Sequence, residues 1–194
     1  MPLNIAIVGA GPAGLYLAYL LKRRRPETHI RVFEQNARDV TFGFGVVFSD
    51  RALEFLRDDD PHTYEAIVPK MESWSDIELR HPAGSVRIDG IGFSAIGRLE
   101  LLGLLRARLD AVGVVPEYDR RVASLTELKN ADLIIGADGV NSLVREAHAP
   151  AFGASVAFLT NKFAWYGTTR RFETLTQTFV RTDHGVYNAH HFRY

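Results

Sequence analysis

The chain alternates short apolar runs with glycine-containing turns and with stretches of helical periodicity. Leu3–Val8 is rich in β-branched residues and ends at a glycine, which predicts a buried strand. Pro12–Arg25 follows as a predicted helix, because a proline suits the first helical turn and a run of cations before Pro26 suits the last. Ile30–Glu34 is the next apolar run. This order predicts a strand–helix–strand unit with the glycines in its first turn.

The middle of the chain predicts a helix, a hairpin and a second helix. Ser49 suits the N-cap of a helix over Asp50–Arg57, and the three aspartates that follow predict a solvated turn rather than a metal site. Two strand-like pieces joined by Pro-Ala-Gly predict a hairpin inserted at about residues 74–97. A second helix is then predicted from leucines at helical spacing before the stop at Gly113, namely Leu99, Leu102, Leu105 and Leu109.

Three further short strands are predicted: Val114–Glu117, Arg121–Leu125 and Leu133–Ile135. After Pro150, apolar and polar positions alternate and aromatic residues are frequent, which predicts an antiparallel sheet. The predicted fold class is therefore α/β, with a Rossmann-like βαβ core, an inserted hairpin and the start of an antiparallel sheet. We expect a dinucleotide-binding domain over residues 1–150 and a partial sheet domain over residues 151–194.

Composition narrows the classes of function. Apolar residues make up 46% of the 194 residues and charged residues 24%, as in an ordinary globular protein. The chain carries 23 Lys plus Arg and 23 Asp plus Glu, which argues against a nucleic-acid partner. No apolar run reaches the length of a membrane span, so no membrane partner is expected. The absence of cysteine excludes a catalytic thiol and fits a cytoplasmic location, while the oligomeric state stays open.

The first predicted turn, GAGPAG, carries the spacing of a dinucleotide fingerprint. Gly9 permits the tight turn, Gly11 lets the backbone approach a pyrophosphate, and Gly14 allows close packing of helix on strand. The helix that opens with Pro12 and Ala13 would offer its free N–H groups to phosphates. A glycine-rich turn without a ligand is the alternative interpretation.

Two later features extend this pattern. Glu34 ends the second strand, where a carboxylate accepts hydrogen bonds from a ribose. Residues 132–145 read DLIIGADGVNSLVR, in which an apolar strand breaks into Asp138-Gly139 and a polar turn with Arg145. NAD and FAD share the first motif, whereas a plain NAD domain has no need of the second. The pair therefore points to a flavin.

Both motifs resemble those of the single-component FAD-dependent aromatic hydroxylases, a family of flavoprotein monooxygenases. GAGPAG with Glu34 resembles their FAD fingerprint, and DLIIGADGVNSLVR resembles their Asp-Gly motif. Two more stretches, FGFGVVFSDRALEFL and KFAWYGTTRRFETLTQTFVRTDHGVYNAHHFRY, resemble the FAD module of salicylyl-CoA 5-hydroxylases and anthraniloyl-CoA monooxygenases. The similarity runs from about residue 3 to the end of the chain.

The resemblance implies roles for individual residues. Arg98 would lie against the FAD phosphates, with an ordinary exposed arginine as the alternative, and Val122 would meet the adenine through its backbone. Asp138 and Gly139 would lie by the pyrophosphate and ribityl chain, and Arg145 would help to hold NAD(P)H. The full implied set of cofactor-binding residues is Gly9, Gly11, Pro12, Ala13, Gly14, Glu34, Gly45, Val46, Arg98, Val122, Asp138, Gly139 and Arg145.

The resemblance also implies a reaction. FAD would be the cofactor and NADH or NADPH the co-substrate, and O₂ would form a flavin C4a-hydroperoxide that hydroxylates an aromatic acid or an aromatic acyl-CoA. No catalytic side chain is predicted, since the flavin carries the chemistry. The family's third FAD motif, a late Gly-Asp pair, has no counterpart here, which predicts a part of a longer enzyme. A non-catalytic nucleotide-binding module and an NAD-dependent dehydrogenase are the alternatives.

Three groups of residues receive no predicted role. His190 and His191 alternate along a predicted strand and so face opposite sides, which argues against a shared metal site. Three aromatic residues after Pro150 would either line a pocket or form the core of the sheet: Trp165, Tyr166 and Phe179. The core is the favoured interpretation. The arginines available to a CoA thioester are too scattered to indicate a site: Arg170, Arg171 and Arg193.

Overall fold

The computed structural model describes residues 2–194, which form two compact units. The first unit runs to Thr41 and resumes over Leu101–Phe163. The second consists of Phe42–Glu100 and Ala164–Tyr194. The predicted domain boundary at residue 150 stays a prediction. The two compact units are each built from two separate segments, because the strand Ile77–His81 pairs with the strand Leu175–Thr182 near the C-terminus.

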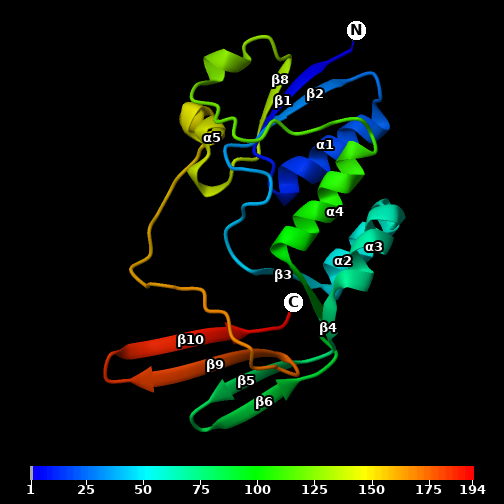
Figure 1. Ribbon diagram of the computed structural model, residues 1–194. Coiled ribbons are helices and arrows are strands. Elements are labelled where there is room, and N and C mark those ends of the chain that lie inside the picture. Colours follow the sequence, from blue (N-terminus) through cyan, green and yellow to red (C-terminus); the bar gives the residue numbers. More distant parts are fainter. Residues whose placement is uncertain (1) are drawn as a thin grey trace. The chain divides into compact units, whose positions relative to one another are not determined.

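The first unit is built on a parallel sheet in the order β2-β1-β8 (Figure 1). The strands are β1 (Asn4–Val8), β2 (His29–Phe33) and β8 (Leu133–Gly136), and α1 (Pro12–Arg24) connects the first two. The predicted βαβ unit is thus confirmed, with Rossmann-like topology. The central strand β1 is apolar and buried from its second residue onward, as a strand covered on both faces requires.

Helices surround this sheet. Helix α1 contacts β1 and β2 through a buried stripe that includes Leu15 and Ala18, and α5 (Leu143–Ala147) contacts β8. Helix α4 begins at Arg98 in the second unit and continues to Asp110 in the first. The shorter elements are η2 (Leu125–Leu128), η3 (Gly139–Asn141) and α6 (Ala149–Phe152). One hydrophobic cluster of the unit contains Ala6, Val8, Phe33, Val122, Leu128 and Val144.

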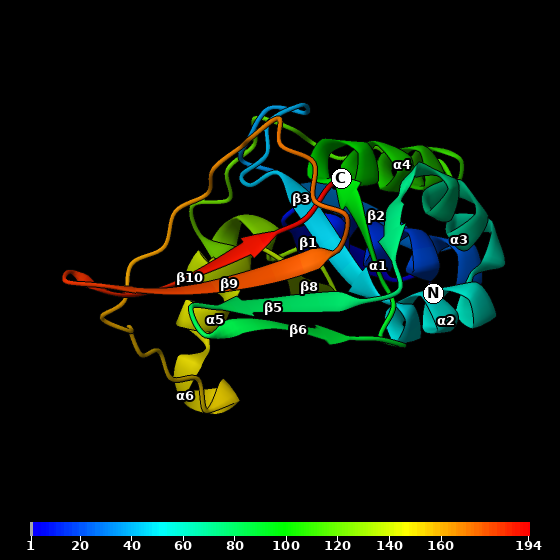
Figure 2. The ribbon, with the colours of Figure 1, turned by 90° about the horizontal axis from the view of Figure 1, so that it is seen from below.

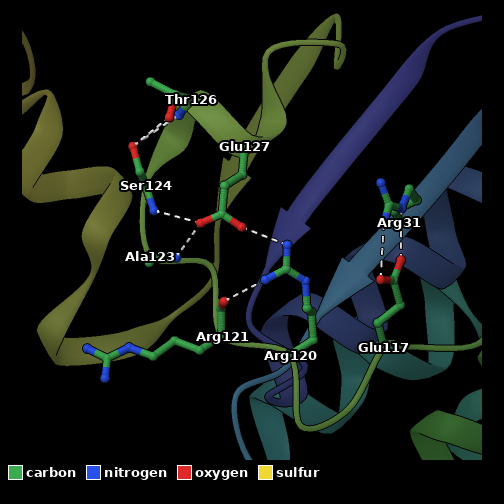
Figure 3. A network of polar contacts seen from close by, with 8 residues as sticks. All are labelled: Arg31, Glu117, Arg120, Arg121, Ala123, Ser124, Thr126 and Glu127. Carbon is green, nitrogen blue, oxygen red and sulfur yellow. Dashed lines mark hydrogen bonds and ion pairs between the residues drawn. The ribbon is translucent and has the colours of Figure 1, made fainter.

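Two predicted strands of this unit are wrong. Val114–Glu117 follows β2 only at its end, where Glu117 N donates to Val32 O at 2.8 Å and one isolated bridge joins Phe33 to Glu117. Arg121–Leu125 ends in η2 instead of forming a strand, because a capping box starts that helix. Ser124 is its N-cap, and the carboxylate of Glu127 accepts from the N–H of Ser124 (Figure 3).

The second unit contains two sheets. Antiparallel strands form the first, in the order β3-β7-β4, with bounds Gly45–Ser49, Phe93–Gly97 and Glu72–Trp74. The second has the order β10-β9-β5-β6 (Figure 2), with bounds Gly185–His191, Leu175–Thr182, Ile77–His81 and Gly84–Ile88. The predicted hairpin is β5–β6. It pairs in parallel with β9, so this sheet is mixed rather than purely antiparallel.

The helices of the second unit are α2 (Asp50–Asp59), α3 (Pro61–Ile67) and η1 (Val68–Lys70). The predicted cap is confirmed, because the side chain of Ser49 accepts from Ala52 N. The predicted solvated turn of three aspartates is wrong, because Asp58 and Asp59 are exposed but belong to α2 and Asp60 is buried. Asp60 has no exposed surface, lies between α2 and α3, and accepts a hydrogen bond from the Thr63 hydroxyl in the first turn of α3 at 2.5 Å. Within residues 2–194, no helix has the length and apolar character needed to cross a membrane.

Candidate dinucleotide-binding site

The first unit brings both sequence motifs to the carboxyl edge of its parallel sheet. Val8 pairs with Phe33 on one side and with Gly136 on the other, so the three strands end at the same level. Gly9 and Glu34 follow β1 and β2 directly, and Asp138 lies just beyond β8. Ligands of parallel α/β sheets bind outside this edge, where neighbouring connections diverge.

The two motifs are in direct contact. A Cβ atom added to Gly9 would lie 2.6 Å from the carbonyl carbon of Ala137 and 2.9 Å from the Cα of Asp138, and Gly9 has a φ of +104°. A Cβ on Gly14 would lie 3.1 Å from the carbonyl carbon of Gly9 and 3.3 Å from the Cβ of Ala137. The protein's own packing therefore requires glycine at both positions.

Gly11 has a different environment. A Cβ added there would have no heavy atom within 4 Å, and its φ of −69° suits any residue. It is the N-cap of α1 and makes no side-chain cap, and the first turn holds no acidic residue. Pro12 and Ala13 continue from it into the helix. The open backbone and uncapped helix start fit the pyrophosphate of FAD, since both favour an anion.

Glu34 is turned toward the glycine turn. Its Oε2 accepts a hydrogen bond from Ala10 N at 3.0 Å, while its Oε1 accepts from the backbone and side-chain nitrogens of Asn36 at 2.9 and 2.8 Å. These donors hold the carboxylate beside the phosphate-binding turn. That position suits a ribose hydroxyl, which would donate to the remaining lone pairs.

The segment that carries Val122 runs past Glu34. Arg120 N donates to the Glu34 carbonyl at 2.8 Å, and the side chain of Val122 is buried in the hydrophobic cluster. Glu127 holds the segment from the other side, accepting from Arg120 Nη2 at 2.6 Å and from Ala123 N at 2.9 Å (Figure 3). The Arg120 guanidinium and these backbone donors hold the pKa of Glu127 below its ordinary value.

Asp138 organises the second motif. Its Oδ1 accepts from the Ser142 hydroxyl at 2.5 Å and its Oδ2 from Leu143 N at 2.7 Å. Gly139 follows with a φ of +77°, a conformation that favours glycine. Arg145 folds back and donates to the carbonyls of Gly139, at 3.4 Å, and Val140. In this structure Asp138 and Arg145 thus shape the turn, and their contacts to a cofactor stay predictions.

Gly45, Val46 and Arg98 lie in the second unit. The register of β3 with β7 places Gly45 opposite Gly97, and Arg98 N donates to the Phe44 carbonyl at 2.8 Å, so the three residues are neighbours. A Cβ on Gly45 would come within 2.8 Å of the Phe192 ring, which gives this glycine a packing reason of its own. Their cofactor roles stay predictions.

The structure also places the aromatic residues and histidines for which the sequence predicts no role in cofactor binding. The expected core position of Trp165 and Tyr166 is wrong, because 60% and 89% of their surfaces are exposed. His191 stacks on Phe172 with ring centroids 4.6 Å apart. Across residues 2–194, no three His, Cys, Asp or Glu side chains group as metal ligands. The Ser124–Glu127 capping box was missed, although its S-x-x-E spacing was visible in the sequence.

Known proteins resemble this chain both over its first motif and along most of its length. A model of the NAD(P)-binding Rossmann-like domain matches residues 7–66. Over 190 residues the chain is 43% identical to salicyloyl-CoA 5-hydroxylase of Streptomyces sp, covering 97% of this chain and 36% of that protein. The chain is thus similar to FAD-dependent aromatic monooxygenases. The resemblance read from the two motifs is thereby confirmed.

A second curated relative is also a monooxygenase. Over 192 residues the chain is 29% identical to 3-hydroxy-4-methyl-anthranilyl-(aryl-carrier protein) 5-monooxygenase of Streptosporangium sibiricum, covering 99% of this chain and 54% of that protein. The chain thus spans 36% and 54% of the lengths of these two curated relatives.

Two solved structures share the fold. The tetrameric form of 2-methyl-3-hydroxypyridine-5-carboxylic acid oxygenase matches with a TM-score of 0.64 and 23% identity, over 75% of this chain and 42% of that chain. A variant of P. aeruginosa PqsL matches with a TM-score of 0.65 and 16% identity, over 93% of this chain and 55% of that chain.

Proposed function

We propose that this chain is the dinucleotide-binding part of an FAD-dependent monooxygenase that hydroxylates an aromatic acid or an aromatic acyl-CoA. NADH or NADPH is the proposed electron donor and O₂ the proposed oxidant. The observation that supports this most is the meeting of the two motifs, in which the Gly9 backbone lies against Ala137–Asp138 while Gly11 stays open. The relative named for salicyloyl-CoA supports the substrate class.

In this proposal the protein binds and orients the cofactor. The start of α1 holds the pyrophosphate through backbone N–H groups, and Glu34 accepts from the adenosine ribose. Asp138 keeps Gly139 in the conformation that lets the backbone approach the cofactor. When bound, FAD supplies the redox chemistry of oxygen transfer.

Reconstitution with FAD tests the proposal. We expect the full-length enzyme to which this chain belongs to retain a yellow flavin, and we expect an aromatic acid or its CoA thioester to accelerate its NAD(P)H oxidation together with O₂ uptake. Flavin retention by the full-length protein without turnover on any aromatic compound would instead support the non-catalytic nucleotide-binding module. A colourless protein that transfers hydride without O₂ would support the dehydrogenase, to which the NAD(P)-binding family match also points.

A further inference from the structure

A hollow of about 470 Å³ lies on the four-stranded sheet of the second unit. Its wall comes from β5, from β6 and from residues 170–174, which lead into β9. This volume falls within the range of small-molecule sites. None of the residues predicted to bind the dinucleotide lines it, so it is a second candidate site.

Strand register gathers four arginines around the hollow. Glu78 and Arg80 alternate on β5 and therefore share one face of the sheet. Pairing with β6 sets Arg87 opposite Glu78 on that same face. The parallel pairing of β5 with β9 then brings Arg170 and Arg171 to the hollow, since these residues precede β9. Distant positions in the sequence thus form one basic cluster.

The four guanidiniums are unequally neutralised. Arg80 pairs with Glu78 at 2.8 Å, and Arg87 donates from Nε to Asp76 Oδ2 at 2.6 Å. Within residues 2–194, neither the Arg170 nor the Arg171 guanidinium pairs with a carboxylate, and that of Arg170 lies 5.6 Å from the centre of the Phe172 ring. Two cations at one hollow therefore have bonding capacity left for an anion.

The carboxylates of the lining do not balance this charge. Glu78 and Glu173 face the four arginines, which leaves an excess of positive charge at the hollow. This positive charge also affects His191, whose ring stacks on Phe172. Burial lowers the pKa of His191, and the positive charges of Arg80, Arg170 and His190 lower it further. A basic hollow raises the local concentration of anions and attracts multiply charged groups most strongly.

We propose that this hollow binds a phosphate group of an organic ligand through the guanidiniums of Arg170 and Arg171. A guanidinium presents two parallel N–H donors that match phosphate oxygens, and two unpaired guanidiniums suit a doubly charged phosphate better than one carboxylate. Arg80 and Arg87 add to the positive field. Two ligands available to the proposed enzyme carry such groups: the CoA part of an aromatic thioester, and NADPH.

Calorimetric titration of the whole protein tests the site. The ligands are CoA, 3′-dephospho-CoA, pantetheine, NADPH, NADH and inorganic phosphate. The variants are Arg170→Ala and Arg171→Ala, with Arg181→Ala as the matched control because Arg181 is exposed on β9 and does not line the hollow. Neither Arg170 nor Arg171 pairs with a carboxylate in the described part of the chain, and the Arg170 contact with the Phe172 ring is exposed, so we expect these variants to unfold close to the wild-type temperature.

We expect CoA or NADPH to bind, and each hollow variant to weaken that binding about 10- to 100-fold, as loss of a charged hydrogen bond does. Raising the salt concentration should weaken it as well. Stronger binding of CoA than of 3′-dephospho-CoA would identify CoA, and stronger binding of NADPH than of NADH would identify the nicotinamide cofactor. Repeating the titrations in Gly11→Ala separates this site from the glycine turn.

Three results would overturn the inference. They are equal affinity in wild type and both hollow variants, binding of pantetheine as tight as that of CoA, and binding of inorganic phosphate with no gain from the organic part. The inference does not depend on the flavin. A protein that holds FAD but shows no arginine-dependent phosphate binding refutes only the second site, whereas a flavin-free protein that binds CoA through Arg171 refutes only the proposed function.

Discussion

The carboxylate of Glu34 accepts a hydrogen bond from Ala10 N at 3.0 Å. This contact fastens the end of β2 to the turn that follows β1, across the edge at which a dinucleotide would bind. Glu34 therefore has two roles, one in stability and one in ligand binding, which can be measured separately. It stabilises the unliganded turn, and in the proposed complex it also accepts from the ribose.

Glu34→Ala should lower the free energy of unfolding by about 1–3 kcal/mol, because Ala10 and Asn36 lose a charged acceptor in a half-buried place. Urea unfolding followed by circular dichroism measures this. Glu117→Ala is the control, since its ion pair with Arg31 is exposed and should contribute less than about 1 kcal/mol. An equal decrease in the free energy of unfolding in the two variants would contradict the stabilising role assigned to the Glu34 hydrogen bonds.

Gly14→Ala should destabilise the protein by about 3 kcal/mol, because the added methyl would collide with the Gly9 carbonyl inside a packed turn. Gly11→Ala should leave the free energy of unfolding within about 0.5 kcal/mol of wild type, since its φ is ordinary and no atom lies near. Thermal unfolding of both variants checks the contrast. A large loss in Gly11→Ala would show that this glycine also serves the fold.

The βαβ core could be predicted from sequence because its signals are local. The glycine turn, Pro12 and the cations at the end of α1 lie within a single short stretch of chain. Likewise Ser49 and the β5–β6 turn were predicted correctly, since a cap or a tight turn depends on adjacent residues. Asp138 was found because its motif is also contiguous.

Long-range pairing explains what the sequence could not show. The parallel pairing of β5 with β9 joins segments that are distant in the sequence. The sequence alone therefore does not show that Arg170 and Arg171 lie beside Arg80 and Arg87. The burial of Asp60 is not visible in the sequence, because it depends on how the chain packs around the connection between α2 and α3.

Asp138→Ala should cost about 1–2 kcal/mol of stability, because the N-cap Ser142 and the first helical residue Leu143 both lose their hydrogen bonds to the Asp138 carboxylate. Asp138→Asn should cost less, since the amide keeps one oxygen acceptor. Hydrogen exchange at the amide of Leu143 reports the local effect directly. Unchanged protection of that amide in Asp138→Ala would contradict the assigned bond.

The pKa of His191 should be measurable below its unfolded value of 6.5, first because of burial and then because of Arg80 and Arg170. As the pH falls through 6.5, the unfolded chain binds this proton before the folded protein does, so the free energy of unfolding should fall until the folded pKa is passed. NMR titration of the ring measures the pKa, and His191→Gln should remove this part of the pH dependence. A pKa above 6.5 would contradict the positive field.

The most direct test of the central claim is the affinity for FAD of the wild-type protein and of Gly11→Ala, measured through the visible flavin absorbance after reconstitution. Our account predicts that the wild type retains FAD, and that Gly11→Ala loses it while unfolding at the wild-type temperature, because the methyl occupies the space left for the pyrophosphate. A wild-type protein that gains no flavin, or a Gly11→Ala variant that binds FAD as tightly as wild type, would contradict the assignment of this turn as the cofactor site.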